Sequence, residues 1–366
     1  MKKKGGNRDR DDRENVSVLS YWLMYLLPGV AAIFMANRLR DHTLSPWVGM
    51  WLLYVILIGL RFEVGGDWFN YLRHYEFALH YDLKDILLGK GGDPGYVLLN
   101  WIAANNDWGM EFVNLVCAIV FVTGLINFCR QQPAPWIGFA VAVPYLVIVL
   151  GMGYTRQGVA LGLLFWALIW LERRHLWHFL FFIGIAAMFH KSAVILVPLG
   201  LFVTKGNWLY RIIAVASVLY GLWSLTLADA IDSMWVNYVD AQMQSSGARV
   251  RVLMNLLPGL VLLFFHKRWR VAFPEGRFWY WMALGSIAAA GLVEFASTAV
   301  DRLSLYLTPL QVVVLSRLPF LLCKEISPET LAVITILGYA AVLFVWLNYA
   351  THAVHWIPYQ NTMFLW

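Results

Sequence analysis

The chain has 366 residues, of which 60% are hydrophobic and only 14% are charged, and its mean hydropathy is +0.61. Soluble domains are nearer half apolar and a quarter charged, so this composition excludes an ordinary soluble protein. The formal charge of +6 is distributed in a way that argues against a nucleic-acid-binding role.

The charged tail Met1–Asn15 has no apolar side chain after Met1, so we expect it to be disordered. Apolar runs of about 15–25 residues then fill almost the whole chain, and runs of this length are typical of membrane-spanning helices. We therefore expect an all-α, polytopic integral membrane protein with about 12 transmembrane helices in one transmembrane domain, 16–366. The expected spans are 16–36, 47–60, 111–128, 136–152, 157–171, 176–189, 192–204, 208–228, 250–265, 278–297, 303–317 and 329–349.

A more polar stretch separates the second and third spans. Residues 61–93 are expected to form a polar segment outside the membrane. Residues 94–106 (PGYVLLNWIAANN) are apolar but too short to cross comfortably, so they predict a short re-entrant or interfacial helix.

Lysine and arginine fall in two sets of links, and the positive-inside rule uses them to orient the chain. One set lies in short basic links and is assigned to the cytoplasm: Arg38, Arg40, Arg130, Arg173, Arg174, Lys205, Arg211, Lys267, Arg268, Arg270, Arg277, Arg317 and Lys324. The other set then faces outward: Arg61, Arg73, Lys84, Lys90, Arg156, Lys191, Arg249, Arg251 and Arg302. Twelve crossings would place the basic tail outside, against the rule, but the reverse orientation would export both of the strongest basic links.

Four clusters of outward-facing residues carry candidate chemistry, because an unpaired charge among apolar neighbours is costly. In the first, Arg61 ends a span and Asp67 follows a tight Gly65-Gly66 turn. The rings of Trp68 and Tyr71 come next, and flat rings beside a carboxylate suit a sugar. The structural alternative is an interfacial loop with an Arg61–Asp67 ion pair.

The second cluster, GMGYTRQG (151–158), places Arg156 between two spans, with glycines that we expect to let the backbone approach a ligand. A guanidinium beside a helix N-terminus favours a phosphate. The third, FHKS (189–192), offers His190, whose ordinary pKa is near neutrality, and Lys191 as a second phosphate partner. The alternative for both clusters is a cation that snorkels to the lipid headgroups.

The fourth cluster contains Asp301 and Arg302, which we expect to open a helix. Glu294, inside the preceding span, is a further functional candidate because carboxylates are rare there. The alternative is that Asp301 caps the helix and makes a local salt bridge.

Several motifs are absent from the sequence. It has no P-loop, no HExxH and, in the membrane region, no DxD. The three cysteines have no CxxC spacing and support neither a disulfide framework nor a zinc site. We therefore expect no metal and no cofactor, and embedded cations favour a pyrophosphate held by arginine and lysine.

Ordered motifs along the chain closely resemble the EpsG/Wzy-like family of exopolysaccharide and O-antigen polymerases. These motifs are GLRFEVGGDWFNY, DPGYVLLNWI, the RQG at Arg156–Gly158, FHKSAVILVPL, DRLSLYLTPLQ and the terminal PYQN at Pro358–Asn361. The resemblance runs from about residue 45 to Asn361. Family members often have Thr-Asp-Tyr where this chain has Gly66-Asp67-Trp68, and Asp67 is retained.

The resemblance implies a multi-pass enzyme of the bacterial inner membrane with its active site facing the periplasm. Such an enzyme joins oligosaccharide repeat units carried on undecaprenyl pyrophosphate, which serve as donor and acceptor. Membrane lipid, a flippase and a chain-length regulator are the further partners to expect, and nucleic acid is not. We expect metal-independent, inverting transfer.

The candidate residues then divide into three roles. The catalytic candidates are Asp67 as base, with Asp301 and His190 behind it. The pyrophosphate-binding candidates are Arg61, Arg156, Lys191 and Arg302. The sugar-binding candidates are Trp68, Tyr71, Asp93 and Gln157. Two other functions stay open: a ligase that moves lipid-linked glycan to another acceptor, and a flippase or transporter for the lipid-linked sugar.

Overall fold

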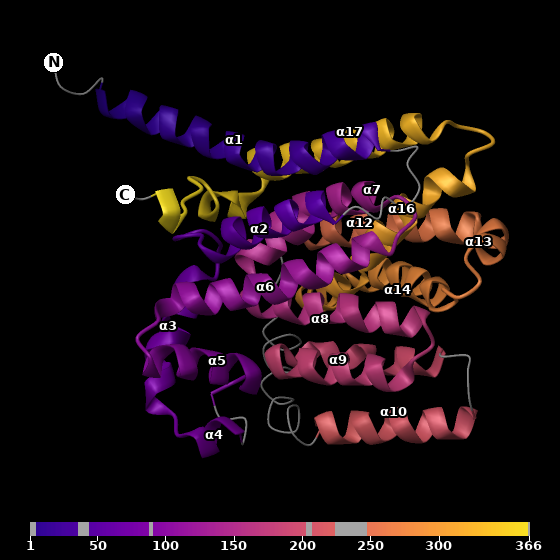
Figure 1. Ribbon diagram of the computed structural model, residues 1–366, viewed down its shortest axis with the longest axis horizontal. Helices are drawn as coiled ribbons and strands as arrows, with labels where there is room; N and C mark the ends of the chain where they lie inside the picture. Colours follow the sequence, from indigo (N-terminus) through magenta and orange to yellow (C-terminus); the bar gives the residue numbers. More distant parts are fainter. Residues whose placement is uncertain (1–4, 36–43, 88–90, 203–206, 224–246, 365–366) are drawn as a thin grey trace.

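The apolar runs form helices throughout the part of the chain that the computed structural model describes, namely residues 5–35, 44–87, 91–202, 207–223 and 247–364 (Figure 1). Within these ranges there is no β-strand, and the one isolated bridge joins Arg61 to Asn361. The all-α prediction is therefore confirmed.

In chain order the elements are α1 (Gly5–Phe34), α2 (Ser45–Gly59), α3 (Trp68–Phe77), η1 (Ala78–His80), α4 (Leu83–Leu87), α5 (Pro94–Asn105), α6 (Gly109–Arg130), α7 (Pro135–Ala142), η2 (Val143–Gly151), α8 (Thr155–Glu172), α9 (Leu176–Phe189), η3 (Lys191–Phe202), α10 (Trp208–Leu222), α12 (Ala248–Phe264), α13 (His266–Ala272), α14 (Phe278–Leu292), α15 (Ser297–Ser304), η6 (Leu305–Leu307), α16 (Pro309–Leu321), α17 (Pro328–Tyr349), η7 (Thr351–His355) and η8 (Thr362–Phe364). The η elements are short 3-10 segments, except for η3, a longer 3-10 segment, and η2, a π-helical continuation of α7.

Helix length decides how many of these elements could cross a membrane unaided. Among the described residues, α6 and α17 are long and apolar enough, and the number rises to four if the bent pairs α12–α13 and α15–α16 each form one span. The other apolar helices have 10–17 residues. A 15-residue helix is about 22 Å long, whereas the hydrocarbon layer is about 30 Å thick. The expected count of about 12 spans is therefore not confirmed, although the apolar helices fit a membrane protein.

Two other predictions concern the ends of elements. The short helix expected at 94–106 is confirmed as α5, and its re-entrant or interfacial placement stays a prediction. Helix α1 begins at Gly5, inside the tail for which we expect disorder, and that expectation also stays a prediction. The ends of the expected spans 16–36, 192–204 and 208–228 extend beyond the described residues.

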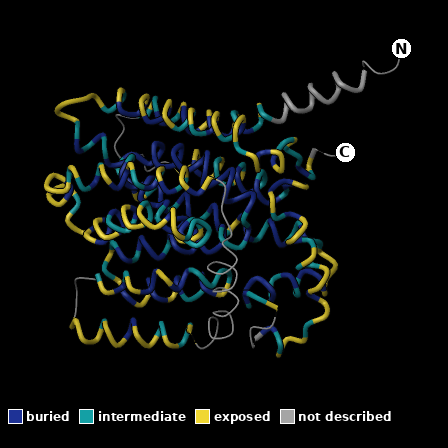
Figure 2. The backbone as a smooth tube through the Cα atoms, turned by 180° about the vertical axis from the view of Figure 1, so that it is seen from behind, coloured by how far each residue is buried: buried dark blue, intermediate teal, exposed yellow. Residues whose placement is uncertain are grey.

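The buried residues lie along the middle of the bundle and the exposed residues on its outer helices (Figure 2). At the centre, α8 packs against both α6 and α9. A Cβ atom on Gly124 of α6 would lie 2.0 Å from the carbonyl oxygen of Gly162 on α8. Only glycine at this crossing allows the two backbones to approach so closely, which is how helices commonly pack in membranes.

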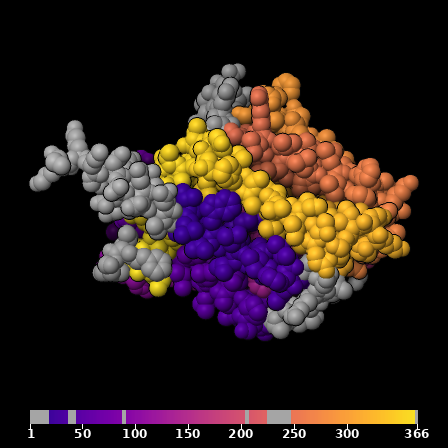
Figure 3. Space-filling model, turned by 90° about the horizontal axis from the view of Figure 1, so that it is seen from above, coloured from indigo at the N-terminus to yellow at the C-terminus, as the bar shows by residue number. Residues whose placement is uncertain are grey.

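The outer surface of the bundle is itself apolar. Helices α1 and α17 lie side by side on the face shown in Figure 3. Leu23 on α1 and Leu337 and Phe344 on α17 are 52%, 64% and 49% exposed. An extended apolar surface of this kind is unusual on a soluble monomer and fits a lipid environment.

The bundle has two polar ends, and α8 connects them. Arg156 near its start and Glu172 at its end are about 24 Å apart along the axis. Arg156 bonds to Asp93, the residue before α5, and Glu172 lines the same pocket as Ala272 at the end of α13. Helices α5 and α13 lie at opposite sides of Figure 1. We call these the α5 end and the α13 end.

Candidate functional site

A cavity of about 370 Å³ occupies the α5 end, and we call it the arginine cavity. It is lined by Asp67, Tyr71, Tyr145, Tyr154, Arg156, Gln157, His190, Arg251, Thr298, Asp301, Arg302, Leu305 and His352. Segments that are far apart in the sequence therefore meet in one space. Candidates from all four sequence clusters line it: Asp67, Tyr71, Arg156, Gln157, His190, Asp301 and Arg302.

Arg156 is held in place by Asp93. Its Nη1 atom donates to Asp93 Oδ2 at 3.0 Å, and the two side chains are 33% and 6% exposed. The backbone N–H of Lys191 donates to the other carboxylate oxygen, Oδ1, at 3.2 Å. Burial raises the pKa of Asp93, and the charge of Arg156 opposes that rise. Asp93 is not among the lining residues, so its position suits orienting Arg156 rather than contacting a sugar.

His190 and Lys191 of the third cluster lie in different environments. His190 lines the arginine cavity, whereas the described contact of Lys191 is the backbone bond to Asp93. Burial, with the positive charges of Arg156 and Arg302, lowers the pKa of His190 to about 3. The imidazole is therefore neutral near pH 7, and it is a weak proton acceptor.

Asp301 pairs with Arg251, a residue that the sequence places on this face but not in the site. Arg251 Nε and Nη2 donate to the two Asp301 oxygens, both at 2.5 Å, and the side chains are 18% and 14% exposed. The two parallel bonds fix the orientation of the guanidinium. The sequence signal that could identify the site of Arg251 is Asp301, because a carboxylate among apolar residues is costly unless a cation lies nearby.

The helix around Asp301 differs from the prediction. It begins at Ser297 after Ala296, so Asp301 and Arg302 lie inside α15 and neither opens nor caps it. Glu294 follows the end of α14, is 53% exposed and pairs with Arg249 at 2.5 Å. It is not among the residues that line the cavity. Glu294 therefore lies just outside the helix in which the sequence places it, and its role as a functional candidate stays a prediction.

Arg61 is buried and does not line the arginine cavity. Its side chain is 1% exposed, and Nη1 and Nη2 donate to the Ile58 carbonyl at 2.6 Å and the Thr155 hydroxyl at 2.7 Å. The ring of Trp68 lies 5.8 Å from the guanidinium and is also buried. Neither residue lines the cavity. Through its bond to the Thr155 hydroxyl, Arg61 anchors the start of α8, one residue before Arg156.

Asp67, in contrast, faces the arginine cavity. Among the described residues it forms no ion pair with Arg61, and its described hydrogen bond is from Asn70 Nδ2 at 3.3 Å. It is partly exposed and precedes α3 directly. The alternative of an Arg61–Asp67 ion pair is therefore wrong.

The glycines of the first two clusters serve packing. A Cβ on Gly153 would lie 2.3 Å from the ring of Trp356, and one on Gly65, where φ is +108°, would lie 2.6 Å from the Met152 carbonyl oxygen. Trp356 Nε1 donates to the Ile148 carbonyl at 2.8 Å. Gly65 and Gly153 therefore allow close packing, and Gly153 lets the C-terminal segment dock. A Cβ on Gly158, close to Arg156, would meet no atom nearer than 3.8 Å, so the expectation that a glycine beside Arg156 lets a ligand approach stays a prediction.

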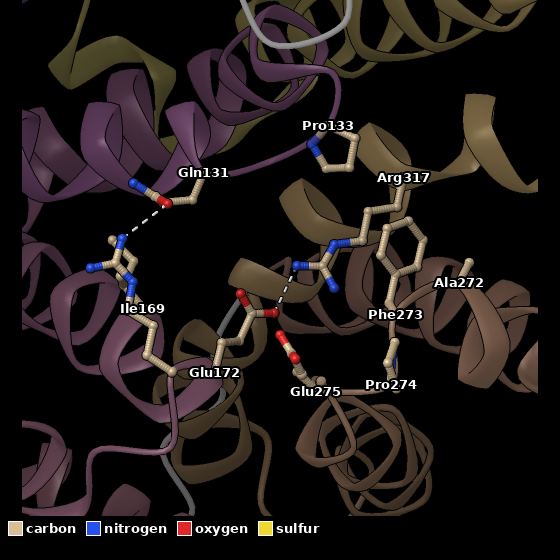
Figure 4. Close-up of a pocket in the computed structure, with 11 residues that line it drawn as sticks. Gln131, Pro133, Ile169, Glu172, Ala272, Phe273, Pro274, Glu275 and Arg317 are labelled. Atoms are coloured by element: carbon tan, nitrogen blue, oxygen red, sulfur yellow. Dashed lines mark hydrogen bonds and ion pairs between the residues drawn. The ribbon is translucent and has the colours of Figure 1, made fainter. Parts of the chain in front are cut away.

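The α13 end has a pocket of its own, of about 410 Å³, shown in Figure 4. Arg317 points across it and donates to Glu172 Oε1 at 2.7 Å and to Gln132 Oε1 at 3.0 Å. The indole N–H of Trp279 donates to the same Glu172 oxygen at 2.7 Å. This arginine is only 5% exposed and is bonded to the protein itself.

The arginine cavity can hold an anion. Arg156, Arg251 and Arg302 line it, and guanidinium groups bind phosphate oxygens with paired hydrogen bonds. Among the described residues, no three His, Cys, Asp or Glu side chains are placed to hold a metal ion together.

An all-helical bundle with an apolar surface and a cationic cavity at one end fits a membrane protein that binds an anionic ligand. The EpsG family model matches residues 46–361, so the chain belongs to the EpsG family, and the resemblance seen in the sequence is confirmed. This membership suggests a membrane protein of the polysaccharide-polymerase type, generally glycosyltransferase-like.

One curated relative is a different lipid-modifying enzyme. The chain is 27% identical over 143 residues to a phosphatidylglycerol–prolipoprotein diacylglyceryl transferase of Vibrio atlanticus (strain LGP32). The match covers 39% of this chain and 46% of that protein, less than half of its length. No solved structure matches the chain.

Proposed function

We propose that this EpsG-family protein is a polysaccharide polymerase that joins oligosaccharide repeat units carried on undecaprenyl pyrophosphate. The supporting observation is the arginine cavity, where Arg156, Arg251 and Arg302 line the same space as the carboxylate of Asp67. The reaction needs these two elements together, namely a cationic site for a leaving pyrophosphate and a base for an acceptor hydroxyl.

In the proposed step, the acceptor hydroxyl oxygen attacks the anomeric carbon of the donor sugar. The bond from that carbon to the pyrophosphate oxygen breaks, and undecaprenyl pyrophosphate leaves with the electron pair. The hydroxyl proton passes to Asp67. Negative charge grows on the leaving oxygen, and guanidinium groups already in place stabilise it without reorganisation. A single direct displacement inverts the anomeric configuration.

Asp67 is the base favoured by the contacts. Asp301 is bonded through both oxygens to Arg251, and Asp93 is bonded to Arg156. The lowered pKa of His190 makes it a weak base. Asp67 has the weaker described contact, at 3.3 Å from Asn70 Nδ2. The other carboxylates then serve to orient the arginines.

The proposal gives supporting roles to two residues that the sequence predicts to bind the pyrophosphate. Arg61 supports the start of α8 through Thr155, and Lys191 supports Asp93 through its backbone N–H. Arg251 takes their place beside Arg156 and Arg302, because it lines the cavity.

We propose that the α5 end faces the periplasm. The generic basic links flank the α13 end, where Arg173 bonds to Gln131 and Arg268 to Glu325. By the positive-inside rule that end lies in the cytoplasm. The arginine cavity then opens where units that have already crossed the inner membrane are found.

The direct test uses purified protein in detergent and the lipid-linked repeat unit of its host. The wild-type protein should form polymer, whereas Asp67→Asn and Arg156→Ala should leave single repeat units although their levels in the membrane stay normal. Long-chain product from both variants would contradict the site. Absence of polymer from the wild-type protein would favour transport, and cells that accumulate finished lipid-linked chains in the variants would indicate a ligase.

A further inference from the structure

A second, smaller cavity lies at the α5 end, between α3 and α5, and its function is not explained by the proposed chemistry. It measures about 160 Å³, and we call it the aromatic cavity. Its lining residues are His74, Phe77, Tyr81, Gly91, Tyr96, Val97 and Asn100. Four of these carry rings, and Asn100 adds an amide.

An aromatic wall connects the two cavities. Tyr71, which lines the arginine cavity, meets the ring of Tyr96 edge-on at 5.7 Å between centroids. Tyr96 in turn meets His74 edge-on at 6.0 Å. The guanidinium carbon of Arg156 lies 5.9 Å from the centre of each tyrosine ring. Arg156 therefore marks the boundary between a charged compartment and an aromatic one.

The amide of Asn100 is only half satisfied by the protein. Its Nδ2 atom donates to the Tyr96 carbonyl at 2.8 Å, while Oδ1 is buried without a hydrogen-bond partner among the described residues. The Tyr96 hydroxyl interacts with the Asn100 side chain, but not with the geometry of an ordinary hydrogen bond, and it too is buried without a hydrogen-bond partner among the described residues. Buried polar atoms are normally paired, so an unpaired amide oxygen beside a cavity points to a ligand that donates.

Two further features suit a neutral, hydroxyl-bearing ligand. Gly91 has φ +89°, and a Cβ there would lie 2.7 Å from the Tyr81 ring, so only glycine lets that ring form one side of the cavity. Burial, with the charges of Arg156 and Arg73, lowers the pKa of His74. A neutral imidazole offers one donor and one acceptor.

We propose that the aromatic cavity is a sugar subsite that binds one ring of the repeat unit, adjacent to the ring that reacts in the arginine cavity. Ring faces pack against sugar C–H groups, and the neutral amide and imidazole pair with sugar hydroxyls. The lining residues carry no formal charge when His74 is neutral, which disfavours a phosphate. The volume, less than half that of the arginine cavity, fits one ring rather than a chain. This assignment rests on the proposed function.

Two probes separate the subsite from the pyrophosphate site. One is the lipid-free oligosaccharide released from the carrier of the host's repeat unit, and the other is undecaprenyl pyrophosphate without sugar. Binding of each to purified protein is measured by calorimetry. Asn100→Leu should weaken oligosaccharide binding at least about tenfold and leave binding of the sugar-free carrier unchanged, because it removes only the amide.

Asn105→Leu is the matched control. Asn105 also lies on α5 and donates from Nδ2 to the carbonyl four residues earlier, at 2.8 Å, but it is exposed and outside the cavity. Both probes should bind this variant as they bind wild type. His74→Phe is the second test variant, which keeps a ring and removes the nitrogens, and it decides the question if Asn100→Leu does not fold. It should show the same loss.

Wild-type oligosaccharide affinity in a folded Asn100→Leu or His74→Phe variant would overturn the subsite, as would an oligosaccharide that does not bind the wild-type protein. Sugar-free carrier that binds Arg156→Ala as tightly as wild type would instead count against the proposed function. In the polymerisation assay with Asn100→Leu or His74→Phe, KM should rise either for the acceptor alone or for the donor alone. The substrate with the higher KM is the one whose sugar ring binds in the aromatic cavity. No rise in either would contradict the proposal.

Discussion

The two ends of α8 show two different uses of an arginine side chain. At the α13 end, Arg317 is 5% exposed, bonds to Glu172 and Gln132, and lies between the rings of Trp269 and Phe273, at 5.5 and 4.8 Å (Figure 4). At the α5 end, Arg156 is 33% exposed, bonds to one carboxylate and faces a cavity. We interpret Arg317, which is almost fully buried and bonded to two side chains, as a structural cation, and Arg156, which is partly exposed in the same cavity as Asp67, as a cation available to a ligand.

The same contrast exists within the α5 end. Arg61 resembles Arg317, since it is 1% exposed and its guanidinium donates to the protein through all three nitrogens. Sequence position places Arg61 and Arg156 in one class, whereas burial separates them. Variants of Arg156 and Arg317 test whether burial separates structural arginines from those that bind a ligand.

The largest effect on activity is expected at Arg156. Arg156→Ala should lower polymer formation by about 100-fold or more, because a charge-stabilising donor present only at the reacting centre is lost. Arg156→Lys should recover only part of the activity, since an ammonium cannot form two parallel bonds to phosphate. Initial rates per folded molecule of purified protein measure both, because the loss of Arg156 also leaves the buried Asp93 carboxylate unpaired and should lower the stability of the alanine variant. Full activity in the alanine variant would contradict the role of Arg156 in stabilising the leaving group.

The largest effect on stability is expected at Arg317. Arg317→Ala removes a buried partner of Glu172 and should lower the free energy of unfolding by about 3–5 kcal/mol. Thermal unfolding in detergent measures the loss, and activity per folded molecule should stay near wild type. The double variant Arg317→Met with Glu172→Gln should recover much of the stability, because it leaves no unpaired charge. Loss of polymer without loss of stability would reverse the roles of the two arginines.

Much of this architecture could be predicted from sequence because it is local. Apolar runs specify helices, and every expected span contains one in the described residues. Charged residues at the ends of the apolar runs lie at one of the two polar ends of the bundle. Sequence position therefore predicts that Asp67, Arg156 and Asp301 share one face, and all three line the arginine cavity.

What could not be predicted depends on tertiary packing. The sequence predicts Arg61 and Trp68 in the site, but both are buried and do not line the cavity. The C-terminal segment docks on residues 60–65, next to them. Phe62 N, for example, donates to the Gln360 carbonyl at 3.0 Å. His352 enters the cavity through the same docking. No local pattern in the sequence specifies such a contact across almost the whole chain.

An intermediate effect is expected for the Arg251–Asp301 pair. Asp301→Asn keeps the shape but weakens the two charge-assisted bonds that orient Arg251, so polymer formation should fall about tenfold. Arg251→Lys should have a similar effect, and the double variant should be little worse than either single one, because residues of one network are not additive. Rates of all three variants test this. Multiplicative losses would show that Arg251 and Asp301 act independently.

The smallest effect is expected at His190. Its pKa of about 3 is below the ordinary value of about 6.5, so the imidazole binds a proton only in acid and stays neutral from about pH 5 upward. His190→Gln should therefore change the rate by no more than about threefold and leave the pH–rate profile between pH 6 and 8 unchanged. Loss of a step near pH 6 in this variant would show that His190 titrates during the reaction.

The central claim is that the α5 end holds the pyrophosphate and the α13 end does not. A density map of the protein with bound undecaprenyl pyrophosphate tests it most directly. We predict that the phosphate oxygens lie within hydrogen-bond distance of at least two of Arg156, Arg251 and Arg302. Phosphates bound at Arg317 in the α13 pocket, or outside the arginine cavity altogether, would contradict the account.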